Sequence, residues 1–296
     1  MSIVVTGATG HLGRHVVRHL LEKVPADQVT AVVRDRDKAA DLAARGVRIA
    51  VADYNSPETF DGLFASGDRV LLISGNEFDK GRVGQHTVVI DAAKKAGVAL
   101  LAYTSAPSSL KAALADDHRA TEDVLIGSGV PYVLLRNGWY HENYTEQLAP
   151  VLEHGAVVQA AGEGRISSAS RADYAAAAVA VLTGEGHENT AYELGGDEAW
   201  SFAEYAAELS RQTGKEIVYK PVSVEEYTGI LTGAGLPGPL AGVLAGVDAA
   251  IAEGELVVST GDLSRLAGRP TTPLAQAVAA ALKGCPPPAA VPPRLS

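Results

Sequence analysis

The residues near the start of the chain whose type and spacing could do chemistry are three glycines. Gly7, Gly10 and Gly13 stand in "TGATGHLG", after the apolar run "IVV" and before "HLGRHVVRHL", whose apolar residues recur at helical spacing. In such a strand–turn–helix unit the first glycine makes the tight turn, the second lets a pyrophosphate approach the backbone, and the third lets the helix pack closely. The free amides at the helix N-terminus then face the phosphates.

The glycine series therefore predicts a dinucleotide-binding turn, although an ordinary glycine-rich turn is the structural alternative. The residues expected to contact the cofactor in this turn are Gly7, Ala8, Thr9, Gly10, His11, Leu12 and Gly13.

Arg34, at the end of the second apolar run, bears on which dinucleotide binds. At this point of the fold a carboxylate accepts from the ribose 2′-hydroxyl of NAD, whereas an arginine suits the 2′-phosphate of NADP. A guanidinium can also stack on a flat ring, which lysine cannot do as well. Arg34 thus predicts NADP(H). In the alternative, Arg34 is solvated and Asp35 or Asp37 binds an NAD ribose.

Three more candidates follow the third and fourth apolar runs: Asp53, Ser74 and Gly75. The carboxyl ends of parallel strands form the edge at which open α/β sheets bind ligands, so these residues are expected to line the adenine and the middle of the cofactor. Each residue type is also common where any strand meets a loop.

The elements that must position these residues alternate along the first half of the chain. Short β-branched runs alternate with helical segments, the pattern of parallel strands joined by helical crossovers. We therefore predict an α/β fold, a Rossmann-type doubly wound parallel sheet with a smaller C-terminal lobe. The expected strands are 3–6, 29–34, 47–54, 69–74, 99–105 and 131–137, and the expected helical segments are 11–23, 36–45, 57–66, 83–96 and 116–128.

The regular alternation ends near residue 137, which indicates a second unit. Residues 1–138 are expected to form the NADP-binding core, with its sheet completed by parts of 155–196, including a strand at 191–196. Residues 139–284 are expected to form mainly a substrate-binding lobe, in which the Gly- and Pro-rich stretch 232–246 is a flexible loop leading into a helix. The proline-rich end, 285–296, is expected to be disordered because proline removes hydrogen-bond donors.

Composition narrows the function classes. The formal net charge of −10 argues against nonspecific nucleic-acid binding, which depends on Lys and Arg contacts to phosphate. Cys285 is the only cysteine, so no intrachain disulfide is expected. Without a signal peptide or a membrane-length apolar segment, we expect a cytoplasmic protein. The histidines show no metal-ligand spacing, so no metal is expected.

Several longer strings resemble a known family. "TGATGHLG", Arg34, "AYTSA" (102–106) and "LLRNGWYHENY" (134–144) are similar to the NmrA-like branch of the atypical short-chain dehydrogenase/reductases, over about residues 1–284. The last string, "SSASRADYAAAA" (167–178) and "YELGGDEAW" (192–200) resemble the NADPH-dependent quinone reductases of that branch. The resemblance implies NADPH as cofactor and a small quinone as substrate.

The same resemblance implies that the segment after the sixth strand covers the nicotinamide and borders the substrate, with Trp139 and Asn143 positioning the substrate. Alternatively, Trp139 and Tyr140 are core residues that tie the lobe to the sheet. Arg171 is expected to reach the cofactor, and Asp173 to cap the following helix. The implied cofactor segment is Asn137, Gly138, Trp139, Tyr140, His141, Glu142 and Asn143.

The usual catalytic pair of short-chain dehydrogenases, Tyr-x-x-x-Lys, is missing. If Glu122 aligns with the glutamate that often follows the motif, Leu114 and His118 occupy the tyrosine and lysine positions. A quinone accepts hydride into a delocalised anion, so a phenolic donor is less needed than with a ketone. His118 could be a general acid, a cofactor contact or an ordinary surface-helix histidine.

Three functions therefore remain open. The first is an NADPH-dependent quinone reductase that transfers hydride directly to the quinone. The second is a non-catalytic NADP(H)-binding redox sensor of the NmrA type, which acts through protein partners. The third is reduction of another conjugated substrate, as in relatives similar to isoflavone reductase, which usually carry a catalytic lysine that is not evident at His118.

Overall fold

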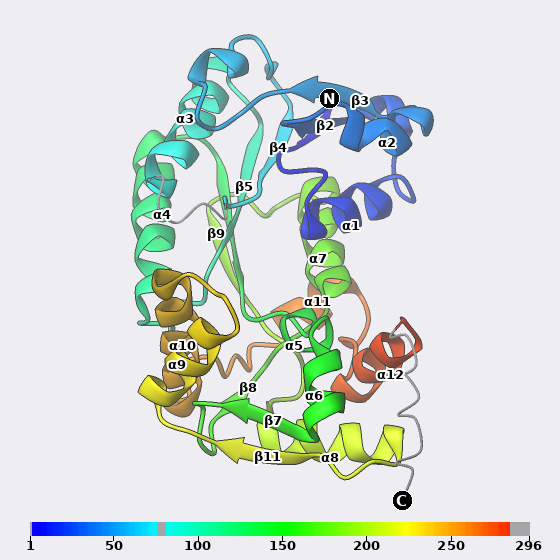
Figure 1. Cartoon of the computed structure of the whole chain (residues 1–296). Coiled ribbons are helices and arrows are strands. Elements are labelled where there is room, and N and C mark those ends of the chain that lie inside the picture. Colours follow the sequence, from blue (N-terminus) through cyan, green and yellow to red (C-terminus); the bar gives the residue numbers. More distant parts are fainter. Residues whose placement is uncertain (1, 76–80, 285–296) are drawn as a thin grey trace, which may run out of the picture.

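A computed structural model describes residues 2–75 and 81–284 (Figure 1). Its centre is a seven-stranded sheet in the order β3-β2-β1-β4-β5-β6-β9, in which every neighbouring pair is parallel. This confirms the predicted α/β, Rossmann-type fold. The strands are β1 (Ile3–Val5), β2 (Val29–Val33), β3 (Arg48–Val51), β4 (Arg69–Leu72), β5 (Leu100–Ser105), β6 (Tyr132–Asn137) and β9 (Thr190–Leu194).

Helices cover both faces of the sheet, which explains why its strands are apolar nearly throughout. Successive side chains of a strand point to opposite faces: Val5 packs in the cluster with α1 and α7, whereas Val4 packs in the cluster with α3. One face carries α1 (His11–Leu20), α7 (Arg171–Thr183) and α11 (Asp262–Ala267), the other carries α3 (Arg82–Ala96) and α4 (Asp116–Ser128), and α2 (Ala40–Ala44) joins β2 to β3.

The C-terminal lobe has a separate apolar core, built around the aromatic rings of Tyr144, Trp200, Phe202 and Tyr205. Two small sheets frame it: β7 (Ala156–Gln159) runs parallel to β11 (Val218–Pro221), and β8 (Arg165–Ile166) runs antiparallel to β10 (Trp200–Ser201). Its helices are α5 (Glu142–Thr145), α6 (Leu148–His154), α8 (Phe202–Thr213), α9 (Val224–Gly233), α10 (Gly238–Ala252) and α12 (Leu274–Gly284).

Two expectations about local structure need correction. The segment 57–66 forms only a 3₁₀ turn at Pro57–Phe60, because Gly62 takes a left-handed conformation with φ of +70° that stops a helix. The stretch 232–246 is mostly helical, since only a short connection separates α9 from α10. Cys285 and the predicted disordered tail lie outside the described residues. None of the described helices has the length and apolar character needed to cross a membrane.

A candidate active site at the carboxyl edge of the sheet

A cleft of about 410 Å³ opens where the strand order reverses, between β1 and β4. Open α/β sheets bind ligands at such a switch point, outside the carboxyl ends of the strands. Further lining comes from Val32, Val33, Asp35, Lys38, Ala52, Tyr54, Asn55, Ile73 and Gln85. The predicted site residues that line the cleft are Gly7, Thr9, Gly10, His11, Leu12, Gly13, Arg34, Asp53, Ser74 and Gly75.

The glycine turn has the geometry that a close phosphate contact needs. Gly7 has φ of +61°, a conformation that favours glycine. A Cβ on Gly13 would lie 2.3 Å from the Gly7 carbonyl oxygen, so the helix can sit this close to the turn only without a side chain there. Ala8 is fully buried, and therefore shapes the turn from beneath instead of presenting a side chain to the cleft.

Positive side chains stand at the β2 end of the cleft. Arg34 and Lys38 both line it, together with Asp35. Lys38 Nζ lies 4.0 Å from the Asp35 carboxylate, in an exposed pair that contributes little energy. Arginine and lysine at this end suit a ligand carrying an additional phosphate.

The end of β6 holds two polar atoms that a ligand could satisfy. Asn137 is buried, and its Oδ1 accepts no hydrogen bond from the described residues. The indole N–H of Trp139 is also buried and has no hydrogen-bond partner within the described part of the chain. Leaving such groups unpaired is costly. A buried acceptor and a buried donor at a sheet edge fit a polar ligand bound nearby.

Trp139 and Tyr140 point into different cores. Trp139 packs against the lobe cluster, whereas Tyr140 packs against the main core and meets Tyr174 edge-on, with ring centroids 5.3 Å apart. The guanidinium of Arg171 lies over the Tyr140 ring at 5.2 Å. These contacts favour the structural alternative, in which Trp139 and Tyr140 connect the lobe to the sheet. That role is compatible with a second role for Trp139 beside a substrate.

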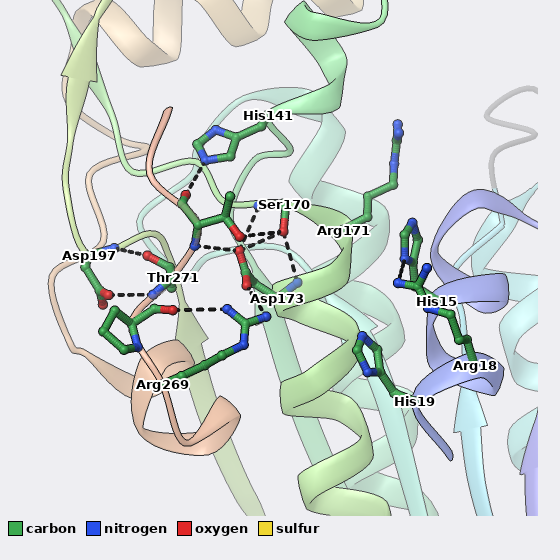
Figure 2. A network of polar contacts seen from close by, with 12 residues as sticks. His15, Arg18, His19, His141, Ser170, Arg171, Asp173, Asp197, Arg269 and Thr271 are labelled. Carbon is green, nitrogen blue, oxygen red and sulfur yellow. Dashed lines mark hydrogen bonds and ion pairs between the residues drawn. The ribbon is translucent and has the colours of Figure 1, made fainter. Parts of the chain in front are cut away.

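His141 and Glu142 are engaged inside the protein. One ring nitrogen of His141 lies 2.9 Å from the Thr272 carbonyl oxygen (Figure 2). The other lies 2.8 Å from Ser168 Oγ, and burial lowers the pKa of this histidine. The Glu142 carboxylate accepts the backbone N–H of Arg171 at the start of α7. Both side chains therefore organise the lobe junction. Gly138 donates its N–H to Leu194 O, and Asn143 donates its N–H to Tyr140 O.

The Arg171 side chain also lies at this junction, with its guanidinium over the Tyr140 ring. The positive charge of Arg171 is one cause, after burial, Arg18 and His19, of the lowered pKa of His15 in α1. Arg171 Nη1 also pairs with Glu146 at 2.5 Å. Arg171 is not among the described residues that line the cleft, so its cofactor role stays a prediction.

Asp173 caps α7, as predicted. Its carboxylate accepts the Ser170 N–H, and Ser170 Oγ accepts the Asp173 N–H, a reciprocal capping box. The same buried carboxylate accepts the Thr272 N–H at 2.9 Å and pairs with Arg269 at 2.7 Å (Figure 2). The hydrogen bonds and Arg269 lower its pKa despite burial. Asp173 therefore anchors the segment that leads into α12.

His118 is buried in α4 and points into the protein. Its Nε2 lies 3.0 Å from an Arg82 guanidinium nitrogen, and its Nδ1 lies 2.9 Å from the Tyr103 hydroxyl. Burial, followed by the positive charge of Arg82, lowers the pKa of His118 to about 3. His118 is thus neutral at physiological pH, and it is not the surface histidine considered above. Leu114, in the preceding 3₁₀ turn, packs against the lobe core.

Some residues that shape the cleft were not predicted. Tyr54 lines it and donates its hydroxyl to the Ile73 carbonyl oxygen at 2.8 Å. Thr6, Thr104 and His86 lie behind residues 73–75, which line the cleft, and each accepts a backbone N–H from that segment. Thr6 and Thr104 end the apolar runs "IVVT" and "LLAYT", and a polar residue at the end of a buried strand was the available signal.

Comparisons with known proteins agree with this geometry. A family model described as NAD(P)H-binding matches residues 7–185. Quinone oxidoreductase 2 from Escherichia coli strain K12 is 45% identical over 278 residues, 93% of this chain and 97% of that protein.

Two solved structures are similar over nearly the whole chain. The NADPH complex of the NADPH-dependent quinone oxidoreductase from Escherichia coli has a TM-score of 0.91 at 45% identity, covering 95% of this chain and 99% of that one. The NADP(H) complex of a Citrobacter triphenylmethane reductase has a TM-score of 0.90 at 43% identity, covering 95% and 100%. With the glycine turn and the cleft at the β1–β4 switch, these matches show that the chain belongs to the NAD(P)H-binding, NmrA-like family.

Proposed function

We propose that this protein is an NADPH-dependent quinone reductase that works without the Tyr-x-x-x-Lys pair. The observation that carries the proposal is the cleft itself: the glycine turn lies on one side, Arg34 and Lys38 at one end, and no phenol or lysine stands at positions 114 and 118. The similarity to a quinone reductase over nearly the whole chain supports the substrate class.

The residues of the chain bind and orient the cofactor. The turn from Gly7 to Gly13 and the N-terminus of α1 would hold the pyrophosphate, and Arg34 would pair with the 2′-phosphate. The orphaned Asn137 Oδ1 would accept from a polar group of the cofactor near the end of β6. When bound, NADPH supplies the hydride, and positioning of the two rings carries most of the rate.

Neither side chain at the positions of the missing pair, 114 and 118, is suited to protonating a substrate at neutral pH. Leu114 is apolar and His118 is buried and neutral, with both ring nitrogens engaged. A quinone that gains a hydride becomes a delocalised hydroquinone anion, which can take its proton from solvent. The missing pair therefore favours a quinone over a ketone.

The test is steady-state oxidation of NADPH and of NADH with a panel of benzoquinones and naphthoquinones. We expect turnover with NADPH, with one quinone reduced for each NADPH consumed. Tight NADPH binding without turnover of any quinone would contradict the proposal and favour the non-catalytic sensor. Turnover of triphenylmethane dyes but not of quinones would reassign the substrate.

A further inference from the structure

The segment that follows β4 forms one wall of the cleft, and its backbone is held in an unusual way. Three successive N–H groups each donate to a side chain from a different part of the fold: Thr6 directly after β1, Thr104 in β5 and His86 in α3. The three pairs are Ile73 N to Thr6 Oγ1 at 3.1 Å, Ser74 N to Thr104 Oγ1 at 2.9 Å, and Gly75 N to His86 Nε2 at 2.9 Å.

The third pair determines the tautomer of His86. Because the Gly75 N–H is a donor, Nε2 must carry a lone pair, and the proton of the neutral ring must sit on Nδ1. Nδ1 lies 2.9 Å from Thr121 Oγ1, which donates its own hydrogen to the Asp117 carbonyl oxygen at 2.7 Å. The hydrogen bonds of this series therefore run in one direction: Gly75 donates to His86, and His86 donates to Thr121 in α4.

The surroundings of His86 keep the ring neutral. The side chain is fully buried, and burial, followed by the positive charge of Arg82, lowers its pKa to about 3. Around it stand the rings of Tyr54 and Tyr103 at centroid distances of 6.3 and 5.3 Å. A protonated ring could not accept from Gly75, so the lowered pKa preserves the contact throughout the physiological range.

The hydrogen bond from Gly75 to His86 also fixes the backbone that forms this wall of the cleft. The N–H groups of residues 73–75 are all engaged by these side chains, so the backbone of Ser74 and Gly75 is held in place along the cleft. Both residues line the cleft. The position of this backbone therefore shapes the space that a ligand in the cleft can occupy.

We propose that His86 is a positioning residue for the cofactor: its Nε2 holds the Gly75 amide and thereby fixes the part of the cleft wall that Ser74 and Gly75 form against NADP(H). This inference rests on the cofactor cleft proposed above, but not on quinone as the substrate. The neighbouring Gln85 supports the same role for the first turns of α3, because it lines the cleft and donates to Asn55 Oδ1 from the loop after β3 at 2.9 Å.

The test compares His86→Phe with His86→Gln. Phenylalanine fills the space but cannot accept from Gly75, whereas the Gln Oε1 can. We expect His86→Phe to raise the dissociation constant for NADPH by ~10-fold, the cost of a lost hydrogen bond that leaves a buried donor unpaired. His86→Gln should recover most of the affinity. Measuring kcat and the KM for quinone at saturating NADPH separates an effect on cofactor binding from an effect on turnover.

His118→Phe is the matched control. His118 belongs to the same buried cluster through Tyr103 but makes no hydrogen bond to residues 73–75. It should leave the NADPH dissociation constant unchanged. Equal weakening by His86→Phe and His118→Phe, or no rescue by Gln, would reduce His86 to a general packing role and overturn the proposal.

Nuclear magnetic resonance of the unmutated protein provides a readout that does not depend on any variant folding. The His86 ring should show a protonated Nδ1 and an unprotonated Nε2 without change from pH 5.5 to 8, and the Gly75 amide should be protected from exchange. Titration of His86 in that range would contradict the proposal. Because NADPH binding is measured without quinone, absent quinone turnover would contradict the proposed function while leaving this inference intact.

Discussion

The three glycines of the first turn do different work, and the structure separates their roles. Gly13 is required by packing, since its Cβ would lie within 3 Å of backbone atoms of Gly7 and Ala8. Gly10 meets only the Gly7 carbonyl oxygen at 3.2 Å and lines the cleft. The motif spacing predicted different roles for the three glycines, and the distances support the packing role of Gly13, whereas the role of Gly10 beside a phosphate stays a prediction.

Gly10→Val should block NADPH binding while leaving the fold largely intact, because the branched side chain would enter the space of the pyrophosphate. Gly13→Ala should instead destabilise the protein, since the turn must move to make room. NADPH titration beside circular dichroism and thermal unfolding separates the two effects. Gly127→Ala, with open space around it, is the neutral control. Unchanged NADPH affinity in folded Gly10→Val would show that the phosphates bind elsewhere.

Arg34→Asp should narrow or reverse a preference for NADPH over NADH. A charge-assisted contact of ~1.5–3 kcal/mol corresponds to roughly 10- to 100-fold in affinity. Dissociation constants for both cofactors provide the measurement. Arg36→Asp is the matched control, because Arg36 reaches the Ile49 carbonyl oxygen and does not line the described cleft. Equal affinities for the two cofactors in the unmutated protein would refute the role of Arg34.

Trp139→Ala should lower kcat/KM for quinone by ~10-fold or more through looser positioning, with little change in NADPH affinity. Trp139→Phe, which keeps an aromatic ring against the lobe core, should retain most of the activity. Steady-state kinetics and melting temperatures are measured together. A lower melting temperature with full activity and unchanged quinone KM would leave Trp139 with its packing role alone.

At the scale of elements, the strands of the main sheet and the long helices α3 and α4 could be predicted from periodicity. The apolar content of 57–66 suggested a helix, but Gly62 ends it through its positive φ, a conformation that composition does not reveal. The strands of the lobe were missed because they are only two to four residues long. Their pairing depends on distant segments, and local pattern carries little information about it.

One lobe contact has a consequence for stability. Asp248, on α10, is buried and accepts the Ala160 N–H beyond β7 at 2.7 Å. Burial raises its pKa to about 7, and the phenols of Tyr144, Tyr219 and Tyr227 face its charge. Because the folded pKa exceeds the unfolded value, the unfolded state releases a proton. Stability therefore falls as pH rises from about 4 to about 7, and the penalty is complete above that range.

Asp248→Asn keeps an acceptor for Ala160 without the charge. We expect it to raise the free energy of unfolding at pH 8 by a few kcal/mol at most, since about three pKa units set an upper limit near ~4 kcal/mol. At pH 4 the difference should nearly vanish. Urea unfolding at several pH values between 4 and 8 measures it. A difference independent of pH would mean that the carboxyl group titrates normally.

For the whole molecule, two apolar cores meet at residues 139–144, with Trp139 in one and Tyr140 in the other. The site that we propose therefore depends on how the lobe sits on the sheet. Sequence could predict the cofactor half, because Gly7, Arg34 and Ser74 follow strands whose edge is known in advance. The residues behind that edge could not be predicted. His86, for example, lies on α3, and only the folded structure brings it into contact with Gly75.

The most direct test of the central claim is a single turnover, in which NADPH-loaded protein is mixed with excess benzoquinone and NADPH absorbance is followed. We predict complete NADPH oxidation, at rates that agree within ~3-fold between the unmutated protein and His118→Ala, because no side chain in α4 donates the proton. General acid catalysis typically supplies ~100- to 10,000-fold. A loss of that size in His118→Ala with NADPH binding unchanged, or no oxidation in the unmutated protein, would contradict direct hydride transfer to the quinone.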